Sequence, residues 1–264
     1  MKNVDITSFV LDNIAFFLLV FARITGMFFT APVFNQGTIP SYVKIGFSLI
    51  LSFLILPFIK ISQDILMDNF YSLFFYITKE LLVGMLIGFI GYLFFSSIYL
   101  AGHLMDMEMG FSMVQVINPM DDTEIPITAN LLTTIAMLVF LSVNGHHRLI
   151  QALLHSFEMI PIGKLSMNQF MYDKIITIFV TSFIIGFKIG APIVVSIFLA
   201  NILLGIMART MPQMNVFVVG MPLKIFLGLI VIFMISSLYI GFFEYIFDIM
   251  FDHMDEFIKL SIKG

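Results

Sequence analysis

Two groups of side chains carry the donor atoms for metal binding or acid–base chemistry. His146 and His147 are adjacent, and His103, Asp106 and Glu108 lie within one short stretch. Zinc sites on helices need histidines one turn apart, as in His-Glu-x-x-His, and the sequence has no such motif. The histidine pair is therefore better explained by a structural turn, and the second group matches no established spacing of cation ligands. We expect no metal site.

Other catalytic groups are also missing from the sequence. It has no cysteine, which excludes disulfides, thiolate metal sites and cysteine nucleophiles. It has no Gly-x-Ser-x-Gly elbow, phosphate-binding loop or dinucleotide fingerprint. The net charge of -4, without a clustered basic face, argues against a nucleic-acid partner. The sequence thus predicts neither an enzyme nor a cofactor.

Charged residues occur where apolar ones are expected. Six basic residues lie within or directly beside apolar runs: Arg23, Lys44, Lys79, Lys188, Arg209 and Lys224. A charge at the centre of a lipid-facing helix costs about 2.5–3.5 kcal/mol on insertion scales. Lys44 and Lys224 border their runs, so we expect them to reach the interface by snorkelling. Lys79 and Glu80 are neighbours that do not face each other on a helix, so each should pair with another helix.

The rest of the chain consists of apolar segments that position these charges. Of its 264 residues, 60% are hydrophobic and 11% are charged, with a mean hydropathy of +1.05, as in an integral membrane protein. We expect an all-α membrane protein with about six hydrophobic helical segments, several broken or bent into hairpins, in a single domain at 1–264. The expected segments are 14–30, 43–56, 70–102, 127–143, 173–192, which could continue as helix past Pro192 to 207, and 222 past 244, with a shorter amphipathic helix at 149–160 and an acidic C-terminal tail at about 248–264.

Two features of the apolar segments bear on their ends and their packing. The first segment is expected to remain in the mature protein, because Pro32 directly after Ala31 is unfavourable for signal-peptide cleavage. Gly84 and Gly88 share one helix face, which either lets another helix approach closely or reflects the tolerance of membrane helices for glycine.

The segment 102–126 lacks the pattern of a membrane-spanning helix, although it lies between two segments that have it. Glycines and prolines interrupt it, and it contains five methionines, Met105, Met107, Met109, Met113 and Met120. Methionine side chains are flexible and polarisable, so they repack when their surroundings change shape. We expect this segment to be a deformable apolar loop that closes a passage.

Five motifs in order along the chain resemble the FliR family of flagellar export-gate proteins. They are Phe-Ala-Arg-Ile-Thr-Gly at 21–26 with Ala-Pro-Val-Phe at 31–34 and Ile-Pro at 39–40, Gly-Phe-Ser-Met at 110–113 with Asn-Pro at 118–119, Asn-Gly-His-His at 144–147, Ala-Arg-Thr-Met-Pro-Gln-Met-Asn-Val-Phe at 208–217, and Gly-Met-Pro-Leu-Lys at 220–224. The similarity extends over about residues 16–243. The related subunits of virulence type III secretion systems remain an alternative.

The resemblance implies a non-enzymatic channel subunit of the bacterial inner membrane and flagellar basal body. It would assemble with the FliP and FliQ subunits, and with other export-apparatus membrane proteins, around a narrow channel for unfolded flagellar proteins. It places the channel plug in a loop at about 106–120. The plug residues are Met107, Met109, Gly110, Phe111, Met113, Val116, Ile117 and Pro119, with Gly110 and Pro119 as hinges. An apolar constriction of this kind gates by dewetting. The charges inside apolar runs, Arg23, Lys79, Glu80, Lys188 and Arg209, would then be buried in the assembly.

Two other functions stay open at this point. A stand-alone secondary transporter would use Lys79, Glu80 and Lys188 as a proton or ion relay at broken helices. An intramembrane hydrolase would depend on His146 and His147, and nothing beyond that pair supports it.

Overall fold

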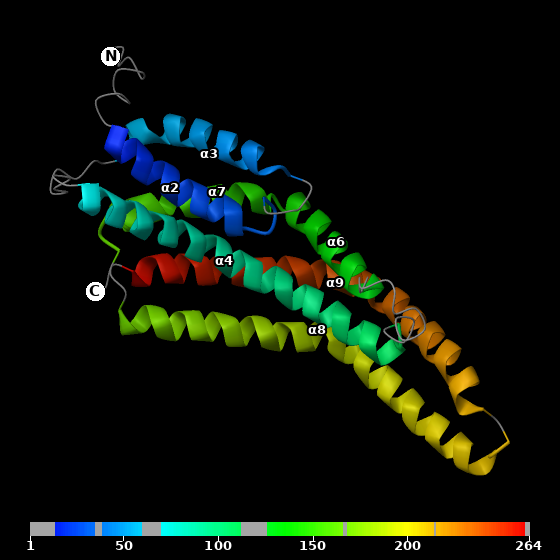
Figure 1. Cartoon of the computed structure of the whole chain (residues 1–264). Helices are drawn as coiled ribbons and strands as arrows, with labels where there is room; N and C mark the ends of the chain where they lie inside the picture. The colour runs from blue at the N-terminus through cyan, green and yellow to red at the C-terminus, as the bar shows by residue number, and fades with distance from the viewer. Residues whose placement is uncertain are drawn as a thin grey trace. The chain divides into compact units, whose positions relative to one another are not determined.

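The computed structural model describes residues 14–34, 39–59, 70–111, 126–165, 168–213 and 215–261, and all regular secondary structure in these ranges is helical (Figure 1). The elements in chain order are α2 (Ile14–Thr30), α3 (Ser41–Ile55), a short 3-10 helix η1 (Leu56–Phe58), α4 (Phe70–Met109), α6 (Ile127–Ser142), α7 (Gly145–Met159), α8 (Gln169–Thr210) and α9 (Val216–Leu260). The predicted all-α fold is confirmed.

Four helices in the described part of the chain are long and apolar enough to cross a membrane, or five if the bent pair α6 and α7 counts as one span. Three of them are unusually long, with 40 residues in α4, 42 in α8 and 45 in α9. At 1.5 Å per residue these helices measure about 60 to 68 Å along their axes, roughly twice the thickness of a bilayer core.

Two predicted helix boundaries are wrong, and the helix that could continue past Pro192 does continue. Gly102 lies inside α4, Pro192 inside α8, and α9 begins at Val216 rather than near Pro222. Glycine and proline are tolerated inside membrane helices when neighbouring groups satisfy the backbone. Close to Pro192, for example, the hydroxyl of Tyr239 donates a hydrogen bond to the carbonyl of Ile189 at 3.1 Å.

The acidic C-terminal segment differs from the prediction of a separate tail, because α9 continues through it to Leu260. Two of its carboxylates pair with bases of other helices. Asp248 accepts a hydrogen bond from Arg148 of α7 at 2.6 Å, and Glu256 forms an ion pair with Lys174 of α8. Arg148 also lies over the ring of Phe251, 4.1 Å from its centroid. These contacts fix the end of α9 in place of a free tail.

The chain divides into two compact units. Unit 1 comprises Met1–Leu93, Asn144–Ile178 and Asp248–Gly264, and unit 2 comprises Phe94–Val143 and Phe179–Phe247. The three longest helices each contribute to both units. The single membrane domain expected from the sequence stays a prediction.

In unit 1, α2 packs between α3 and α4 (Figure 1). A Cβ atom added at Gly84 would collide with the carbonyl oxygen of Arg23, and one added at Gly88 would collide with the hydroxyl of Thr30. A Cβ atom added at Gly26 of α2 would likewise collide with the carbonyl oxygen of Leu81 in α4. The glycines of α4 therefore serve close helix packing, which decides between the two explanations that the sequence left open.

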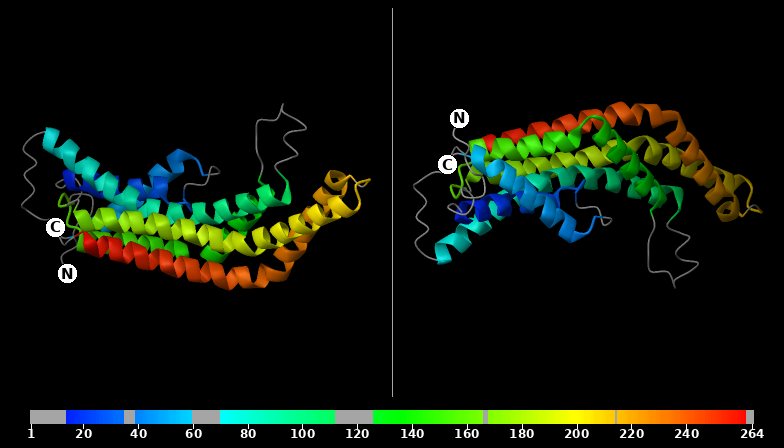
Figure 2. Two further views of the ribbon diagram at one scale, coloured as in Figure 1. Left: turned by 90° about the horizontal axis from the view of Figure 1, so that it is seen from below. Right: turned by 90° about the horizontal axis from the view of Figure 1, so that it is seen from above.

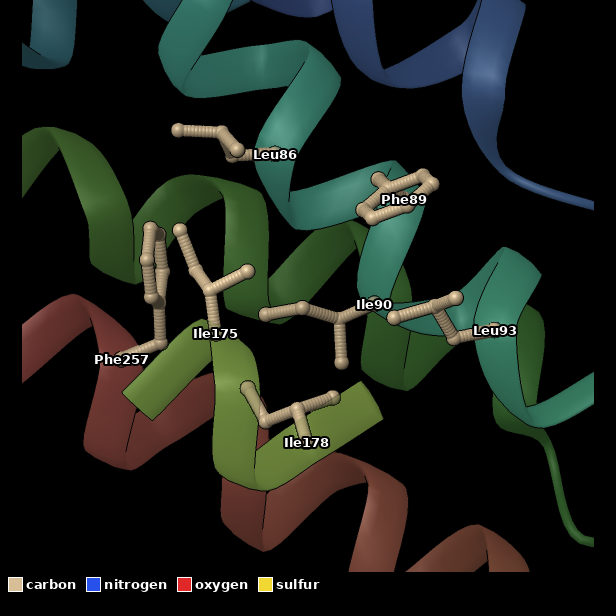
Figure 3. A pocket seen from close by; sticks show the side chains of 7 residues that line it. All are labelled: Leu86, Phe89, Ile90, Leu93, Ile175, Ile178 and Phe257. Carbon is tan, nitrogen blue, oxygen red and sulfur yellow. The ribbon is translucent and has the colours of Figure 1, made fainter. Parts of the chain in front are cut away.

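A small cavity in unit 1 lies between α4, α8 and α9 (Figure 3). Its lining consists entirely of apolar side chains, namely Leu86, Phe89, Ile90, Leu93, Ile175, Ile178 and Phe257. Because none of them offers a polar or titratable group, the cavity provides neither catalysis nor ion binding.

Unit 2 has an aromatic core and a helical hairpin. Phe95, Phe140 and Phe247 pack against one another with ring centroids 5.1 to 5.6 Å apart. The C-terminal part of α8 and the N-terminal part of α9 lie side by side (Figure 2), with Gly220 against the side chain of Leu204. Many apolar side chains of this hairpin remain exposed in the isolated chain.

Candidate functional site

A fully buried ion pair joins α2 to α4 in unit 1. Arg23 and Glu80 each have 0% exposed side-chain surface, and Nε of Arg23 donates to Oε2 of Glu80 at 2.6 Å. The adjacent Lys79 does not compete for this carboxylate, because it lies on another face, 4.8 Å from the ring centroid of Phe75 in the same helix. Glu80 thus pairs with another helix, as its position predicts, whereas Lys79 does not.

The same arginine holds the end of α7. Its Nη1 donates to the carbonyl of Ser156 at 2.8 Å, and its Nη2 donates to the carbonyl of Ile160 at 3.1 Å. The last carbonyls of a helix have no partner within it and carry a partial negative charge, so a cation is favourable there. The guanidinium also lies over the ring of Phe157, 4.3 Å from its centroid. One side chain therefore connects α2, α4 and α7.

Glu80 completes this cluster on its other side. Its second oxygen, Oε1, accepts a hydrogen bond from the N–H of Gly163 at 2.7 Å, in the turn that follows α7. Gly163 has a φ of 77°, a conformation that favours glycine. Both members of the ion pair thus have additional hydrogen-bond partners, as a pair removed from water requires.

The remaining bases of the apolar segments lie in different surroundings. Lys44 was expected to snorkel, but it is buried, with only 7% of its surface exposed, and its Nζ lies 5.7 Å from the ring centroid of Phe29. That expectation is wrong because α3 places the side chain against α2. Lys188 and Arg209 are exposed on α8, and Lys224 is half-buried on α9. Burial of Lys188 and Arg209 in an assembly stays a prediction.

The first residues of the predicted plug loop belong to a helix. α4 continues to Met109, so Met107 and Met109 form its last turn and the loop does not begin at 106. The helix ends at Gly110, which has a φ of 89°. The N–H of Phe111 donates to the carbonyl of Asp106 at 3.0 Å. The N–H of Gly110 donates to the carbonyl of Met107 at 3.2 Å. This pattern is the Schellman motif, in which glycine satisfies the last carbonyls of a helix.

Asp106 also binds the beginning of α6. Its carboxylate accepts hydrogen bonds from the N–H of Thr128 at 3.0 and 3.1 Å and from the N–H of Ala129 at 3.3 Å. Beside it, a Cβ at Gly102 would collide with the backbone of Ala129, so α4 and α6 are in close contact here. Asp106 therefore holds together the two helix ends that flank residues 112–125.

Sequence reasoning missed this role of Asp106, although a signal for it exists. α6 follows Pro126, which has no side chain able to cap the helix, and no side-chain cap is formed locally. The free N–H groups of the first turn must then find an acceptor elsewhere, and a carboxylate is the best match to the positive end of the helix. The acidic residues at the end of the preceding apolar segment, Asp106 and Glu108, were the candidates to examine.

The predicted plug residues in the described part of the chain differ in exposure. Met109 is fully buried, and its sulfur fills the space where a Cβ at Gly228 of α9 would lie. Met107 is 56% exposed. Met109 therefore anchors the end of α4, whereas Met107 faces outward. Four further predicted plug residues lie outside the described residues: Met113, Val116, Ile117 and Pro119.

The groups considered for metal binding lie apart from any ligand set. His146 and His147 occupy the first turn of α7, with ring centroids 4.1 Å apart, and Asp106 is engaged by α6. In the ranges that the structure describes, no three His, Cys, Asp or Glu side chains gather as a metal site would require.

Replacement of Arg23 by methionine should destabilise the protein by about 3–5 kcal/mol, because Glu80 would be left buried and unpaired. The measurement is thermal denaturation of the purified protein in detergent. The matched control is Arg148→Met, which removes an exposed pair with Asp248 and should cost less than about 1 kcal/mol. The double variant Arg23→Met/Glu80→Gln should be more stable than Arg23→Met alone. Equal effects of Arg23→Met and Arg148→Met would contradict this account.

Replacement of Asp106 by alanine should release the first turn of α6. Loss of a helix cap costs about 0.5–2 kcal/mol, which corresponds to roughly 2- to 30-fold faster hydrogen exchange at the amides of Thr128 and Ala129. Exchange measured by mass spectrometry on peptides that cover 127–131 tests this. Glu108→Ala is the control, because Glu108 forms no hydrogen bond or ion pair among the described residues. Unchanged exchange in Asp106→Ala would show that the carboxylate does not hold α6.

Known proteins resemble this chain over nearly its whole length. A family model described as "Bacterial export proteins, family 1" matches residues 14–250. The chain is 36% identical to the flagellar biosynthetic protein FliR of Bacillus subtilis over 255 residues, which cover 95% of this chain and 97% of that protein. It is 30% identical to FliR of Aquifex aeolicus, covering 92% and 91%, and 27% identical to FliR of Escherichia coli, covering 90% of each. The chain therefore belongs to the FliR family of bacterial export proteins.

Proposed function

We propose that this chain is a structural subunit of the flagellar export gate that helps to form and seal the pore for unfolded flagellar proteins. As a FliR protein, it is a membrane-spanning flagellar export protein of the inner membrane and basal body, and the family is structural rather than enzymatic. The role in the pore and the identity of the partner subunits form the proposal.

The length of the exposed apolar helices carries this proposal. Exposed hydrophobic side chains occur near both ends and in the middle of α8, for example Phe170, Phe198 and Ile206, and along α9 from Val218 to Tyr245. Membrane helices tilt by at most about 40°, and at that tilt a straight helix of the length of α8 would still extend about 48 Å along the membrane normal. A hydrocarbon core of about 30 Å covers only part of such a helix. Other protein chains must therefore cover the rest.

The most suitable partners are the FliP and FliQ subunits, which the resemblance implies. Apolar helices of similar length on those subunits would cover the surface of α8 and α9 that lipid does not reach. The glycine contacts of unit 1 show how closely helices of this sequence pack when both surfaces are complementary.

The contacts of the charged residues argue against a stand-alone transporter. Glu80 is occupied by Arg23 and by the N–H of Gly163, and Lys79 lies over Phe75. A proton relay needs groups that exchange protons with one another, and this carboxylate is instead fixed between structural donors.

Purification through a tag on this chain tests the assembly. We expect a stable heteromer that contains FliP-type and FliQ-type subunits and withstands size-exclusion chromatography in mild detergent. The purified chain alone should move no small solute in liposomes. Recovery as a stable monomer, together with solute transport by that monomer, would overturn the proposal.

The plug role applies to residues 112–120 and to the exposed end of α4. Its support is that Asp106 and Gly102 hold the end of α4 against the beginning of α6, the two described helix ends on either side of 112–125 in the sequence. Met107 and Phe111 stand at its beginning, whereas buried Met109 serves as an anchor.

Deletion of 112–120 should leave the heteromer intact but make its channel leaky to ions. The deletion starts at 112 because residues 106–111 end α4 and hold α6. Ion conductance of the reconstituted complex measures the leak. A deletion of 61–65, in the polar connector before α4, is the matched control and should leave conductance low. Equal conductance of the 112–120 deletion and the wild type would place the seal elsewhere.

A further inference from the structure

Two charged side chains of opposite sign stand without partners on unit 2. Lys188 of α8 and Glu244 of α9 are both exposed. Within the described ranges, neither forms a hydrogen bond or an ion pair with any other residue. Other charges of this chain that lie in apolar helices, such as Arg23 and Glu80, are fully engaged. Arg209 and Lys224 also form no ion pair among the described residues, but they lie within about two turns of a helix end, whereas Lys188 and Glu244 lie well inside their helices.

The surroundings of both charges are apolar. Ile184 and Phe187, one turn or less from Lys188, are exposed, as are Ile240 and Tyr245 close to Glu244. Exposed apolar side chains at these positions call for contact with lipid or with protein rather than with water. A charge placed among them needs a counter-charge when that contact forms.

Neither charge can reach a helix end. Lys188 is 19 residues from Gln169 and 22 residues from Thr210, which corresponds to about 28 and 33 Å along α8. Glu244 is 28 residues from Val216 and 16 residues from Leu260, or about 42 and 24 Å along α9. Each charge therefore lies well inside its helix, with exposed apolar side chains close to it.

The two charges lie at nearly the same level of the hairpin. The hydrogen bond from Tyr239 to the carbonyl of Ile189 places those residues side by side. Lys188 precedes Ile189 directly, and Glu244 follows Tyr239 by five residues, so their levels differ by less than about 10 Å. An anionic lipid would satisfy Lys188 but repel Glu244. A protein surface can supply both signs at one depth.

We propose that Lys188 and Glu244 are interface residues that pair with charged side chains on apolar helices of neighbouring subunits. Lys188 receives a carboxylate, from Asp or Glu, and Glu244 receives a Lys or Arg. The inference rests on the proposed function, since it requires that the chain works inside an assembly, and it adds the chemistry of the partner surface. Such pairs contribute to the choice of partner, because a wrong partner leaves a charge unpaired.

The test uses the full chain expressed with its partner subunits, and it measures the fraction recovered in the heteromer. Lys188→Met and Glu244→Gln should each lower that fraction about tenfold, because the partner's charge is left unpaired. Lys188→Arg and Glu244→Asp keep the charge and should restore most of the yield. The thermal stability of each isolated variant should equal that of the wild type, because neither side chain has a partner within the described chain.

Any one of three results with the variants would overturn the inference. Wild-type recovery of Lys188→Met and Glu244→Gln would show that the two charges are not at an interface. Restoration by the exchange variant Lys188→Glu/Glu244→Lys would show that the two residues pair with each other. The recovered fraction could also fall only in Lys188→Met, while assembly of the wild type depends on added phosphatidylglycerol. That result would identify a lipid site instead of a protein interface. If the wild-type chain itself enters no heteromer, the proposed function fails and the inference fails with it.

Discussion

The buried ion pair between Arg23 and Glu80 is the interaction on which the packing of unit 1 depends. Removing both charges from water is costly, and the cost is offset only when every remaining donor and acceptor is satisfied. Here the guanidinium meets the last carbonyls of α7, and the carboxylate meets the N–H of Gly163. These contacts require α2 to lie against α4, and Gly84 makes that approach possible, because any side chain would strike the carbonyl of Arg23.

The two charged contacts at helix ends follow the same electrostatic rule with opposite signs. In unit 1 a cation, Arg23, meets the C-terminal carbonyls of α7, and in unit 2 an anion, Asp106, meets the N-terminal N–H groups of α6. Each charge is the one that the helix dipole favours at that end. Both helices are short, and each of these two ends is held by a residue far away in the sequence.

The surface of the chain is organised in a different way from its interior. Charges that lie inside the units are engaged, whereas the long apolar faces of α8 and α9 remain open. In a FliR protein this contrast has a physical explanation, since a helix twice as long as the bilayer core is thick cannot be covered by lipid alone. This contrast supports the proposal that other membrane proteins cover the open faces of α8 and α9.

The sequence by itself determined the membrane class, the helical fold, and the family, because hydropathy, apolar length and motif order are local properties of the chain. It also showed that Arg23 and Glu80 need partners, since charge in an apolar run is costly wherever the helix lies. Only the tertiary structure decided which partners they have, because Arg23 and Ser156 are brought together from distant segments. The same holds for Asp106, for the burial of Lys44 and Met109, and for the continuity of α8 through Pro192. In each case packing against another helix, and not the local sequence, sets the result.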